Sequence, residues 1–285
     1  MPIIYEPTGK AREYSPLAAN FYDGCDHGCK YCYAPGIRRK ERNEYRDNVR
    51  PRSDIVHLFE KDAIKIKGSK KQILFNFMGD PYCARNNLDM ITRSCLEASL
   101  KNKLPIAILT KGGMRCIQDL ELFKKFGSHI KVGASLTFYD EEKSLEWECG
   151  AATPKERIKA LKIIHENGIK TWASFEPVID PVESLKIMEE SIPFVDEYKV
   201  GKINNFGGLD KKIDWTLFLS NVVDLLRSSK KPFYIKNDLA EAAPKIKLSK
   251  EERTADLFCV TPWAKNEAPI EFSSSRIDKP DLFNA

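Results

Sequence analysis

The chain has 285 residues, of which 42% are hydrophobic and 31% are charged, and its formal net charge is +5. This length and hydrophobic content allow a full core and suit one large α/β domain. No apolar run approaches the ~20 residues that a membrane span requires. The N-terminal Met-Pro-Ile-Ile-Tyr-Glu lacks the basic-then-apolar pattern of a signal peptide. Eight cysteines without that signal predict the reducing cytoplasm, not a disulfide framework.

Strand-like and helix-like segments alternate along the chain. Apolar runs rich in β-branched residues predict strands at 17–22, 72–78, 105–110, 130–138, 171–178, 197–203 and 232–236. Helical periodicity predicts helices at 88–100, 116–126, 154–167, 182–192 and 215–228. The third of these helices has clear end signals, because Thr153, Pro154 and Glu156 form a capping box with proline at the first turn and Gly168 follows.

Strands separated by helices of this length predict βαβ units and a parallel sheet. The order fits a barrel or partial barrel with its active site at the C-terminal ends of the strands. A doubly wound open sheet would give nearly the same order of elements, so periodicity alone does not decide between the two architectures.

A cysteine-rich loop follows the first predicted strand. Cys25, Cys29 and Cys32 have the spacing C-x3-C-x2-C and are followed by Tyr33. An iron–sulfur cube normally takes four cysteine ligands, so a loop that offers three leaves one iron open for chemistry. Structural zinc is the main rival, but it prefers paired C-x2-C or Cys/His motifs, and the other cysteines are scattered singly. His27 could be a fourth ligand only in an awkward local geometry.

Residues 20–34, Asn-Phe-Tyr-Asp-Gly-Cys-Asp-His-Gly-Cys-Lys-Tyr-Cys-Tyr-Ala, resemble the cluster loop of radical S-adenosylmethionine (radical SAM) enzymes. The resemblance is strongest to the branch that includes spore photoproduct lyase. It implies an α/β fold, a partial (β/α)6 barrel over residues 1–240 with the cluster loop at 23–33. We expect the remaining residues, 241–285, to form a C-terminal extension that packs on the barrel.

The same resemblance implies a reaction. Cys25, Cys29 and Cys32 would hold a [4Fe–4S] cluster whose fourth iron binds the methionine group of S-adenosylmethionine. An electron, supplied by a flavodoxin- or ferredoxin-type protein, would cleave this cofactor to a 5′-deoxyadenosyl radical that abstracts hydrogen from a substrate. The rival from another class is a non-catalytic metal protein, with structural zinc or an electron-transfer cluster on the same loop.

Residues at the predicted strand ends match the cofactor-binding positions of the family. Met78, Gly79 and Asp80 resemble the glycine-rich segment that binds the amino group of the cofactor, although the usual acidic residue follows two glycines there. Lys111 matches a lysine that reaches the methionine carboxylate. Ser135 is expected at the ribose hydroxyls. The structural alternatives are an ordinary Gly-Asp-Pro turn, a solvated lysine and a serine that caps a backbone group.

Three more residues are expected near the cofactor or the substrate. The family often has an aromatic residue after the last cluster cysteine that contacts adenine, and Tyr33 fits best, with Tyr31 beside it. Both tyrosines could equally pack the loop against the barrel. Glu176 ends the fifth predicted strand and is expected to bind ribose or substrate, or to begin the following turn.

The hydrogen donor is a point of departure from spore photoproduct lyase. That enzyme carries a cysteine shortly before its Asp-Pro segment, where this chain has Phe77. The nearest cysteine is Cys83, after the turn, and we treat it as a candidate donor. Its alternative role is that of a small buried hydrophobic residue.

A basic segment follows the cluster loop. Residues 38–52 contain seven basic and three acidic side chains. Arg38, Arg39 and Arg42 are therefore predicted to contact the phosphates of a nucleic-acid substrate. A mixed-charge segment is also typical of a solvated surface, and then a peptide or a small metabolite would be the substrate.

Overall fold

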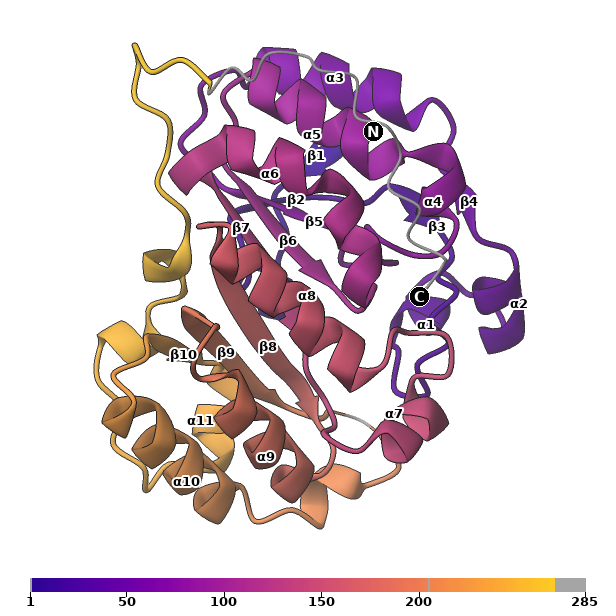
Figure 1. Ribbon diagram of the computed structural model, residues 1–285. Coiled ribbons are helices and arrows are strands. Elements are labelled where there is room, and N and C mark those ends of the chain that lie inside the picture. Colours follow the sequence, from indigo (N-terminus) through magenta and orange to yellow (C-terminus); the bar gives the residue numbers. More distant parts are fainter. Residues whose placement is uncertain (1, 205, 270–285) are drawn as a thin grey trace.

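A computed structural model describes residues 2–204 and 206–269, and its centre is one eight-stranded sheet with the order β1-β2-β5-β6-β7-β8-β9-β10 (Figure 1). Only β1 is antiparallel, and the other neighbouring strands of this sheet pair in parallel. The strands of this sheet are β1 Ile4–Tyr5, β2 Leu17–Ala19, β5 Ile73–Phe75, β6 Ile106–Thr110, β7 Ile130–Ser135, β8 Lys170–Val178, β9 Glu197–Lys202 and β10 Phe233–Ile235. A small second sheet pairs β3 Tyr22–Asp23 with β4 Arg50–Pro51.

Helices cover the outer face of the large sheet (Figure 1). The longer ones are α3 Ile55–Lys65, α5 Ile91–Lys101, α8 Pro154–Glu166, α9 Pro181–Ser191 and α10 Trp215–Ser228. The short ones are α1 Ala34–Ile37, α2 Arg42–Asp47, α4 Asn86–Asp89, α6 Leu120–Phe126, α7 Glu141–Trp147 and α11 Asn237–Ala242. None of the helices described here is long and apolar enough to cross a membrane.

Local signals explain where several helices begin and end. The capping box of α8 forms as predicted, because the Thr153 side chain accepts from the Glu156 amide and the Glu156 side chain accepts from the Thr153 amide. Gly168 follows α8 with a φ of +73°. The helix predicted at 88–100 is instead divided into α4 and α5, because Met90 between them adopts a φ of +52°. The prediction at 116–126 also changes, since Gly113–Asp119 forms a 3-10 helix before α6.

The two faces of the sheet differ in polarity. In β9, Tyr198 and Val200 point outward into the hydrophobic core beneath the helices, whereas Glu197 and Lys199 alternate with them and point inward. Lys131 in β7 also points inward, where it forms a buried ion pair with Glu197. Buried charged side chains therefore alternate with the outward apolar ones, as interior-facing positions alternate with exterior ones along the strands of a barrel. The predicted partial barrel is thus confirmed, with β1 and β10 as the edges of the open sheet.

The N-terminal segment lies against the far edge of this open sheet. Lys10 pairs with Asp238 at 2.9 Å, and Arg12 binds both carboxylate oxygens of Asp256 at 2.7 and 2.9 Å. The Glu13 carboxylate accepts hydrogen bonds from the Tyr234 hydroxyl and from the amide of residue 237. The segment before β2 therefore bridges β2 and β10, the two ends of the parallel part of the sheet.

The segment after α11 packs under the barrel. The Val260 amide donates to Gln72 Oε1 at 3.0 Å, and Trp263 stacks on His129 with 3.8 Å between ring centroids. Gln72 and His129 precede β5 and β7, so this segment closes the N-terminal ends of the strands. The predicted domain boundary at 240/241 falls inside α11, and residues 270–285 of the predicted extension lie outside the described residues.

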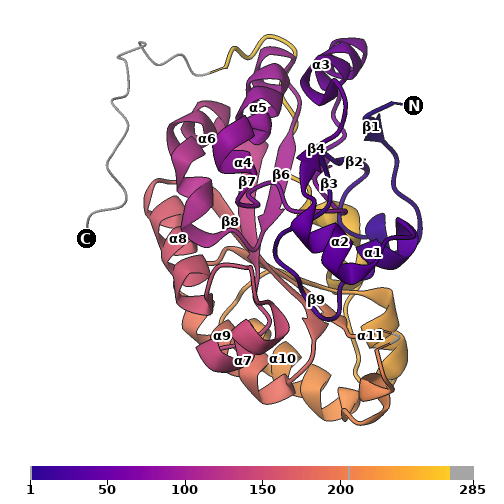
Figure 2. The same ribbon diagram turned by 90° about the vertical axis from the view of Figure 1, so that its right-hand side faces the viewer.

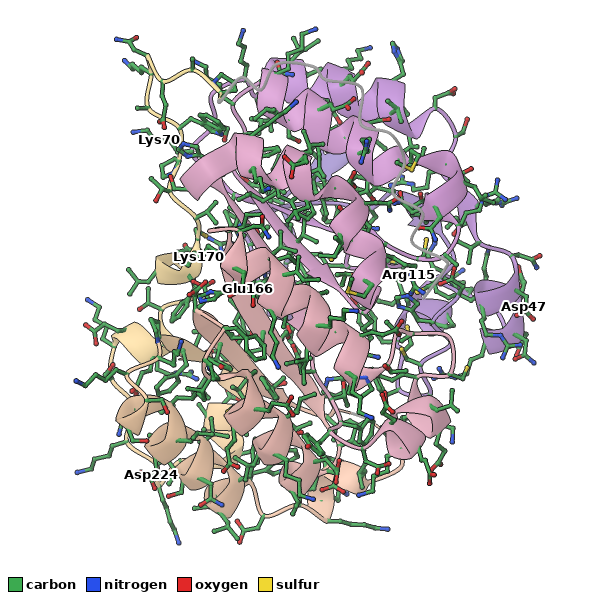
Figure 3. The ribbon with its side chains drawn as sticks, in the orientation of Figure 1. Asp47, Lys70, Arg115, Glu166, Lys170 and Asp224 are labelled. Atoms are coloured by element: carbon green, nitrogen blue, oxygen red, sulfur yellow. The ribbon has the colours of Figure 1, made fainter. Side chains whose placement is uncertain are left out.

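The closed end also carries a surface hollow. It has a volume of about 480 Å³ and lies between β8 and the C-terminal segment, with Lys170, Asp196 and Thr261 in its lining. Figure 3 shows Lys170 at the opposite end of the strands from Arg115 and Asp47, which lie on the side of the cysteine loop. The hollow is thus separate from the C-terminal strand ends.

Candidate cluster and cofactor site

The three cysteines of the motif lie on the loop between β3 and α1. Figure 2 shows α1, α2, β3 and β4 grouped on the side toward which the strands of the large sheet point. Backbone hydrogen bonds fix the loop, since the Cys25 amide donates to the Tyr45 carbonyl and the Cys32 amide donates to the Cys29 carbonyl, each at 3.0 Å. A third bond joins the Lys30 amide to the carbonyl of residue 147 at 2.8 Å. The loop is thereby held at the mouth of the partial barrel.

Two glycines allow the loop after β5 to touch the cysteine loop. Gly24 and Gly79 have φ values of +110° and +100°, which residues with side chains rarely adopt. A Cβ atom on Gly24 would lie 2.8 Å from the Tyr45 carbonyl oxygen, and one on Gly79 would lie 3.0 Å from the Gly24 carbonyl oxygen. Gly79 therefore places the segment after β5 directly against the loop of the three cysteines.

The three thiols are held in a setting that suits a cationic cluster. Burial raises the pKa of the Cys29 thiol to about 12, with further raising from the nearby Glu148 charge. Burial also raises the pKa values of the Cys25 and Cys32 thiols. A thiolate in this position needs a compensating positive charge, and bound iron would supply it.

A single structural metal ion fits less well. Among residues 2–204 and 206–269, no three His, Cys, Asp or Glu side chains gather closely enough to hold one ion. Cysteines on a cubane bind separate irons, so they do not need to converge on one point. His27 is buried, and its Nε2 lies 2.9 Å from Arg115 Nη2 while its Nδ1 lies 3.5 Å from Asp80. These contacts occupy the side chain that could have been a fourth ligand.

Asp80 ties the loop after β5 to the end of β6. Its carboxylate accepts hydrogen bonds from the Thr110 hydroxyl at 2.6 Å, the Lys111 amide at 2.7 Å and the Tyr82 amide at 2.8 Å. Only 6% of Asp80 is exposed. The protein itself therefore fills most of the acceptor capacity of this carboxylate, and its role toward the cofactor stays a prediction.

Met78 lies in the same loop and is held through its backbone. The amides of Phe77 and Met78 both donate to the Asn20 side-chain oxygen, at 2.8 and 2.9 Å. Asn20 stands directly before the cysteine loop and was not singled out from the sequence. It links the loop after β5 to the end of β2.

Lys111 extends from the end of β6 toward a buried carboxylate. Its Nζ lies 4.0 Å from Glu148 and 5.6 Å from the centre of the Tyr31 ring. The Lys111 side chain is 14% exposed, so it is not the solvated surface lysine of the alternative interpretation. No local pattern pointed to Glu148, because this residue reaches the site from the loop after α7.

The two tyrosines of the cluster loop have different surroundings. Tyr31 is half-buried and donates its hydroxyl hydrogen bond to Glu148. Tyr33 is 56% exposed and donates a bond of 3.2 Å to the Phe77 carbonyl. Tyr33 thus leaves a free ring face for a ligand, whereas Tyr31 anchors the loop.

Ser135 ends β7, and Glu176 lies two residues before the end of the neighbouring β8. Ser135 is 6% exposed, and its carbonyl accepts from Arg157 at 3.0 Å. The Glu176 carboxylate binds Lys236 at 2.6 and 2.8 Å and accepts a hydrogen bond from the Tyr14 hydroxyl. Lys236 and Tyr14, from the two sides of the open sheet, were missed because nothing in the sequence relates them to β8.

Cys83 is fully buried in the hydrophobic core. Burial raises the pKa of its thiol, and the nearby Asp26 and Asp80 charges raise it further. The described structure therefore packs this thiol into the core beside the loop of Asp80, and its role as a hydrogen donor stays a prediction.

The basic segment carries its own neutralising charge. Asp23 binds Arg38 at 2.8 Å and Lys40 at 3.2 Å, and it lies 3.6 Å from Arg50. Burial alone would raise the pKa of Asp23, but the bonds from Arg38 and Lys40 lower it. Arg42 contacts the Cys29 carbonyl at 3.5 Å. Arg39 makes no ion pair within the described part of the chain.

The model of the Radical SAM superfamily matches residues 19–195, more than half of the chain and the whole of the site from the cluster loop to Glu176. An uncharacterized protein of Methanocaldococcus jannaschii is 32% identical over 180 residues, which are 63% of this chain and 67% of that protein. An uncharacterized protein of Mycobacterium tuberculosis is 23% identical over 56% of this chain and 48% of its own length.

Solved structures share the fold. SuiB of Streptococcus suis bound to S-adenosylmethionine has a TM-score of 0.60 at 16% identity, over 81% of this chain and 53% of SuiB. A spore photoproduct lyase variant has a TM-score of 0.58 at 10% identity, over 79% of this chain and 77% of the lyase. The chain spans about half the length of SuiB and of the mycobacterial relative. It belongs to the radical SAM superfamily, whose members are enzymes that use a [4Fe–4S] cluster and S-adenosylmethionine.

Proposed function

We propose that Cys25, Cys29 and Cys32 hold the cluster and that the substrate reacts at the mouth of the partial barrel. The observation that carries this proposal is the contact between the cysteine loop and the segment of Gly79, at the C-terminal ends of the strands. A bound, reduced cluster would supply the electron for the reductive cleavage of S-adenosylmethionine, the chemistry by which enzymes of this superfamily would remove a hydrogen atom from a substrate.

The residues around the mouth would position the cofactor. We assign Lys111 to the methionine carboxylate, because its ammonium is shielded and lies beside the cluster loop. The backbone of Met78 and Gly79 lies next to the loop and suits the amino group, with Asp80 holding that backbone in place. We assign Tyr33 to the adenine, because its exposed ring can stack on a base.

Two further strand-end residues belong to this proposal. Ser135 is assigned to the ribose, since it ends β7, the neighbour of the strand that leads to Lys111. Glu176 is assigned to the ribose or the substrate, and its bond with Lys236 would hold the carboxylate in one orientation. A flavodoxin- or ferredoxin-type protein of the cytoplasm is the electron donor in this proposal.

The test begins with the anaerobically reconstituted protein. It should bind about four irons and four sulfides and form 5′-deoxyadenosine from S-adenosylmethionine after reduction by dithionite. Replacing Cys25, Cys29 and Cys32 together by alanine should abolish both properties. Cys149→Ala is the matched control. Cys149 is an exposed cysteine beside the cluster loop, with its Sγ 3.9 Å from the Gly28 carbonyl oxygen, and it is not a proposed ligand.

Each result has a clear meaning. A full cluster in the triple variant would show that other residues are the ligands. A cluster that forms without 5′-deoxyadenosine production would favour the electron-transfer protein, and bound zinc in place of iron would favour the structural metal site.

For the substrate, we propose a nucleic acid or nucleotide that contacts the exposed arginines of the segment after the cluster loop. Arg39 and Arg42 carry the proposal, because Asp23 already neutralises Arg38. The fold is also shared with a spore photoproduct lyase bound to a dinucleoside spore photoproduct. SuiB bound to its precursor peptide SuiA, with a TM-score of 0.61, supports a peptide as the second candidate.

Salt dependence separates the two substrate classes. Each phosphate contact that is lost should reduce the slope of log affinity against log salt by about 0.7–0.9. Arg39→Ala with Arg42→Ala should therefore flatten the slope for an oligonucleotide, whereas Arg38→Ala should change it less. Absence of salt-sensitive binding to single- and double-stranded oligonucleotides would leave the peptide as the favoured class.

A further inference from the structure

Glu148, in the loop between α7 and α8, is a fully buried carboxylate at the junction of four structural elements. The Tyr31 hydroxyl of the cluster loop and the Thr137 hydroxyl after β7 both donate to it, the latter at 2.9 Å. Arg157 of α8 lies 2.5 Å away, and Lys111 at the end of β6 lies 4.0 Å away. One carboxylate thus contacts both the cluster loop and the lysine that we assign to the cofactor.

The surroundings keep this carboxylate charged. Burial alone would raise the pKa of Glu148, but the charges of Arg157 and Lys111 lower it. Arg157 is itself buried, and it is fixed by hydrogen bonds to the Ala152 carbonyl at 2.8 Å and the Ser135 carbonyl at 3.0 Å. A buried anion persists only with such partners. The site therefore holds one fixed negative charge between two positive ones.

The segment that carries Glu148 is docked on the cluster loop on both sides of Cys29. The Lys30 amide donates to the Trp147 carbonyl at 2.8 Å, and the Gly150 amide donates to the His27 carbonyl at 2.9 Å. A Cβ atom on Gly150 would lie 2.0 Å from the Asp26 carbonyl oxygen, so this approach requires glycine. The docking brings the buried charge of residue 148 close to a cluster ligand.

Reduction of a cluster adds an electron near this charge. A fixed anion at short range in a low-dielectric interior opposes that electron, and a fixed cation favours it. The net charge and the hydrogen bonds around iron–sulfur clusters are known to set their reduction potentials. Glu148 and Lys111 should therefore act with opposite signs on the same cluster.

We propose that Glu148 is a positioning residue that holds Tyr31 and Lys111 at the cofactor site, and that its negative charge lowers the reduction potential of the cluster. The inference rests on the proposed cluster ligands and on the proposed role of Lys111. A single group would thus couple the geometry of the cofactor pocket to the ease of reducing the cluster.

The experiment measures the midpoint potential of the reconstituted protein without S-adenosylmethionine, by a redox titration followed by electron paramagnetic resonance. Glu148→Gln keeps the size and the acceptor oxygen but removes the charge, so the potential should become less negative. Lys111→Met removes the neighbouring cation, so the potential should become more negative. The control is Glu146→Gln, two residues away, whose side chain is 64% exposed and pairs only with Lys30 among the described residues; its potential should equal that of the wild type.

A second measurement tests the positioning role. Glu148→Asp keeps the charge but withdraws the carboxylate by one methylene, so its potential should stay close to the wild-type value. Its affinity for S-adenosylmethionine should fall about tenfold, because Lys111 loses its orientation, which corresponds to about 1.4 kcal/mol. An unchanged affinity in this variant would remove the positioning role.

Failure of the inference is distinct from failure of the proposed function. If the reconstituted wild-type protein does not bind about four irons and four sulfides, the proposed function is rejected. A full cluster with wild-type potential in both Glu148→Gln and Lys111→Met would instead overturn the electrostatic role of Glu148. If Glu148→Gln does not retain a cluster, Lys111→Met and Glu148→Asp decide the question by the same two measurements.

Discussion

Asp80 offers the most direct test of how the mouth of the barrel is held together. Its carboxylate joins the loop after β5 to the end of β6 through the amides of Lys111 and Tyr82 and the hydroxyl of Thr110. Replacing Asp80 with alanine leaves these donors without a partner in a buried position. An unsatisfied buried group costs about 1–3 kcal/mol, and water that enters the site would recover part of this cost. We therefore expect Asp80→Ala to lower the free energy of unfolding by about 3–5 kcal/mol.

The assay is urea unfolding of the protein without cluster or cofactor, followed by circular dichroism. Asp47→Ala is the control, because Asp47 is exposed and its ion pair with Arg46 is a surface contact; the expected change is within about 0.5 kcal/mol. The dependence of the free energy on urea should stay the same in both variants. A loss below about 1 kcal/mol for Asp80→Ala would refute the structural role and return Asp80 to the position of a cofactor ligand.

Three other predictions test separate parts of the molecule. Lys111→Ala should weaken the binding of S-adenosylmethionine by about 1.5–3 kcal/mol, the range for hydrogen bonds to charged groups, without loss of iron; unchanged affinity in equilibrium binding would place Lys111 outside the site. Burial lowers the pKa of Lys199 to about 7, below its unfolded value, so the folded protein binds fewer protons above pH ~7. The free energy of unfolding of the wild type, taken relative to that of Lys199→Met, should therefore rise by up to about 1.4 kcal/mol between pH ~7 and ~8. If the free energies of the two proteins change in parallel with pH, this prediction is wrong. Trp263→Ala, which removes the ring stacked on His129, should cost about 3–5 kcal/mol in thermal or urea unfolding, and a change under about 1 kcal/mol would show that the C-terminal segment does not stabilise the barrel.

The strands and most helices could be predicted because their signals are local. The capping residues of α8 and the apolar runs of the strands are all read within a few positions of the sequence. The division at Met90 was missed because a left-handed φ at a methionine has no local signature. The alternation of Glu197 and Lys199 with apolar neighbours in β9 was present in the sequence, and it could have indicated a polar barrel interior.

The site was predicted only where it lies on strand ends or on the cysteine loop. Lys111 follows β6, and Glu176 lies near the end of β8, two strands further along the parallel sheet, so the order of elements brings them to one edge. Glu148 and Lys236 approach the same edge from a loop and from beyond the last strand, and only the packed fold relates them to the cysteines. The ion pair between Asp23 and Arg38 was also not predicted, because it depends on the turn of the chain after the cluster loop.

The contacts between the two ends of the chain constrain how the protein reaches its native state. Lys10 and Asp238 pair across 228 positions, and Glu13 accepts from the amide of Asn237 across 224. Contacts at such separation form late and slowly, because a long loop must close before they can be made. During synthesis, the segment before β2 cannot find its partners until β10 and α11 have been made. Until then the inward-facing Lys131 and Lys199 are exposed to water on that side. A chain shortened before residue 237 would contain the cluster loop, but the interior of its barrel would be open to water.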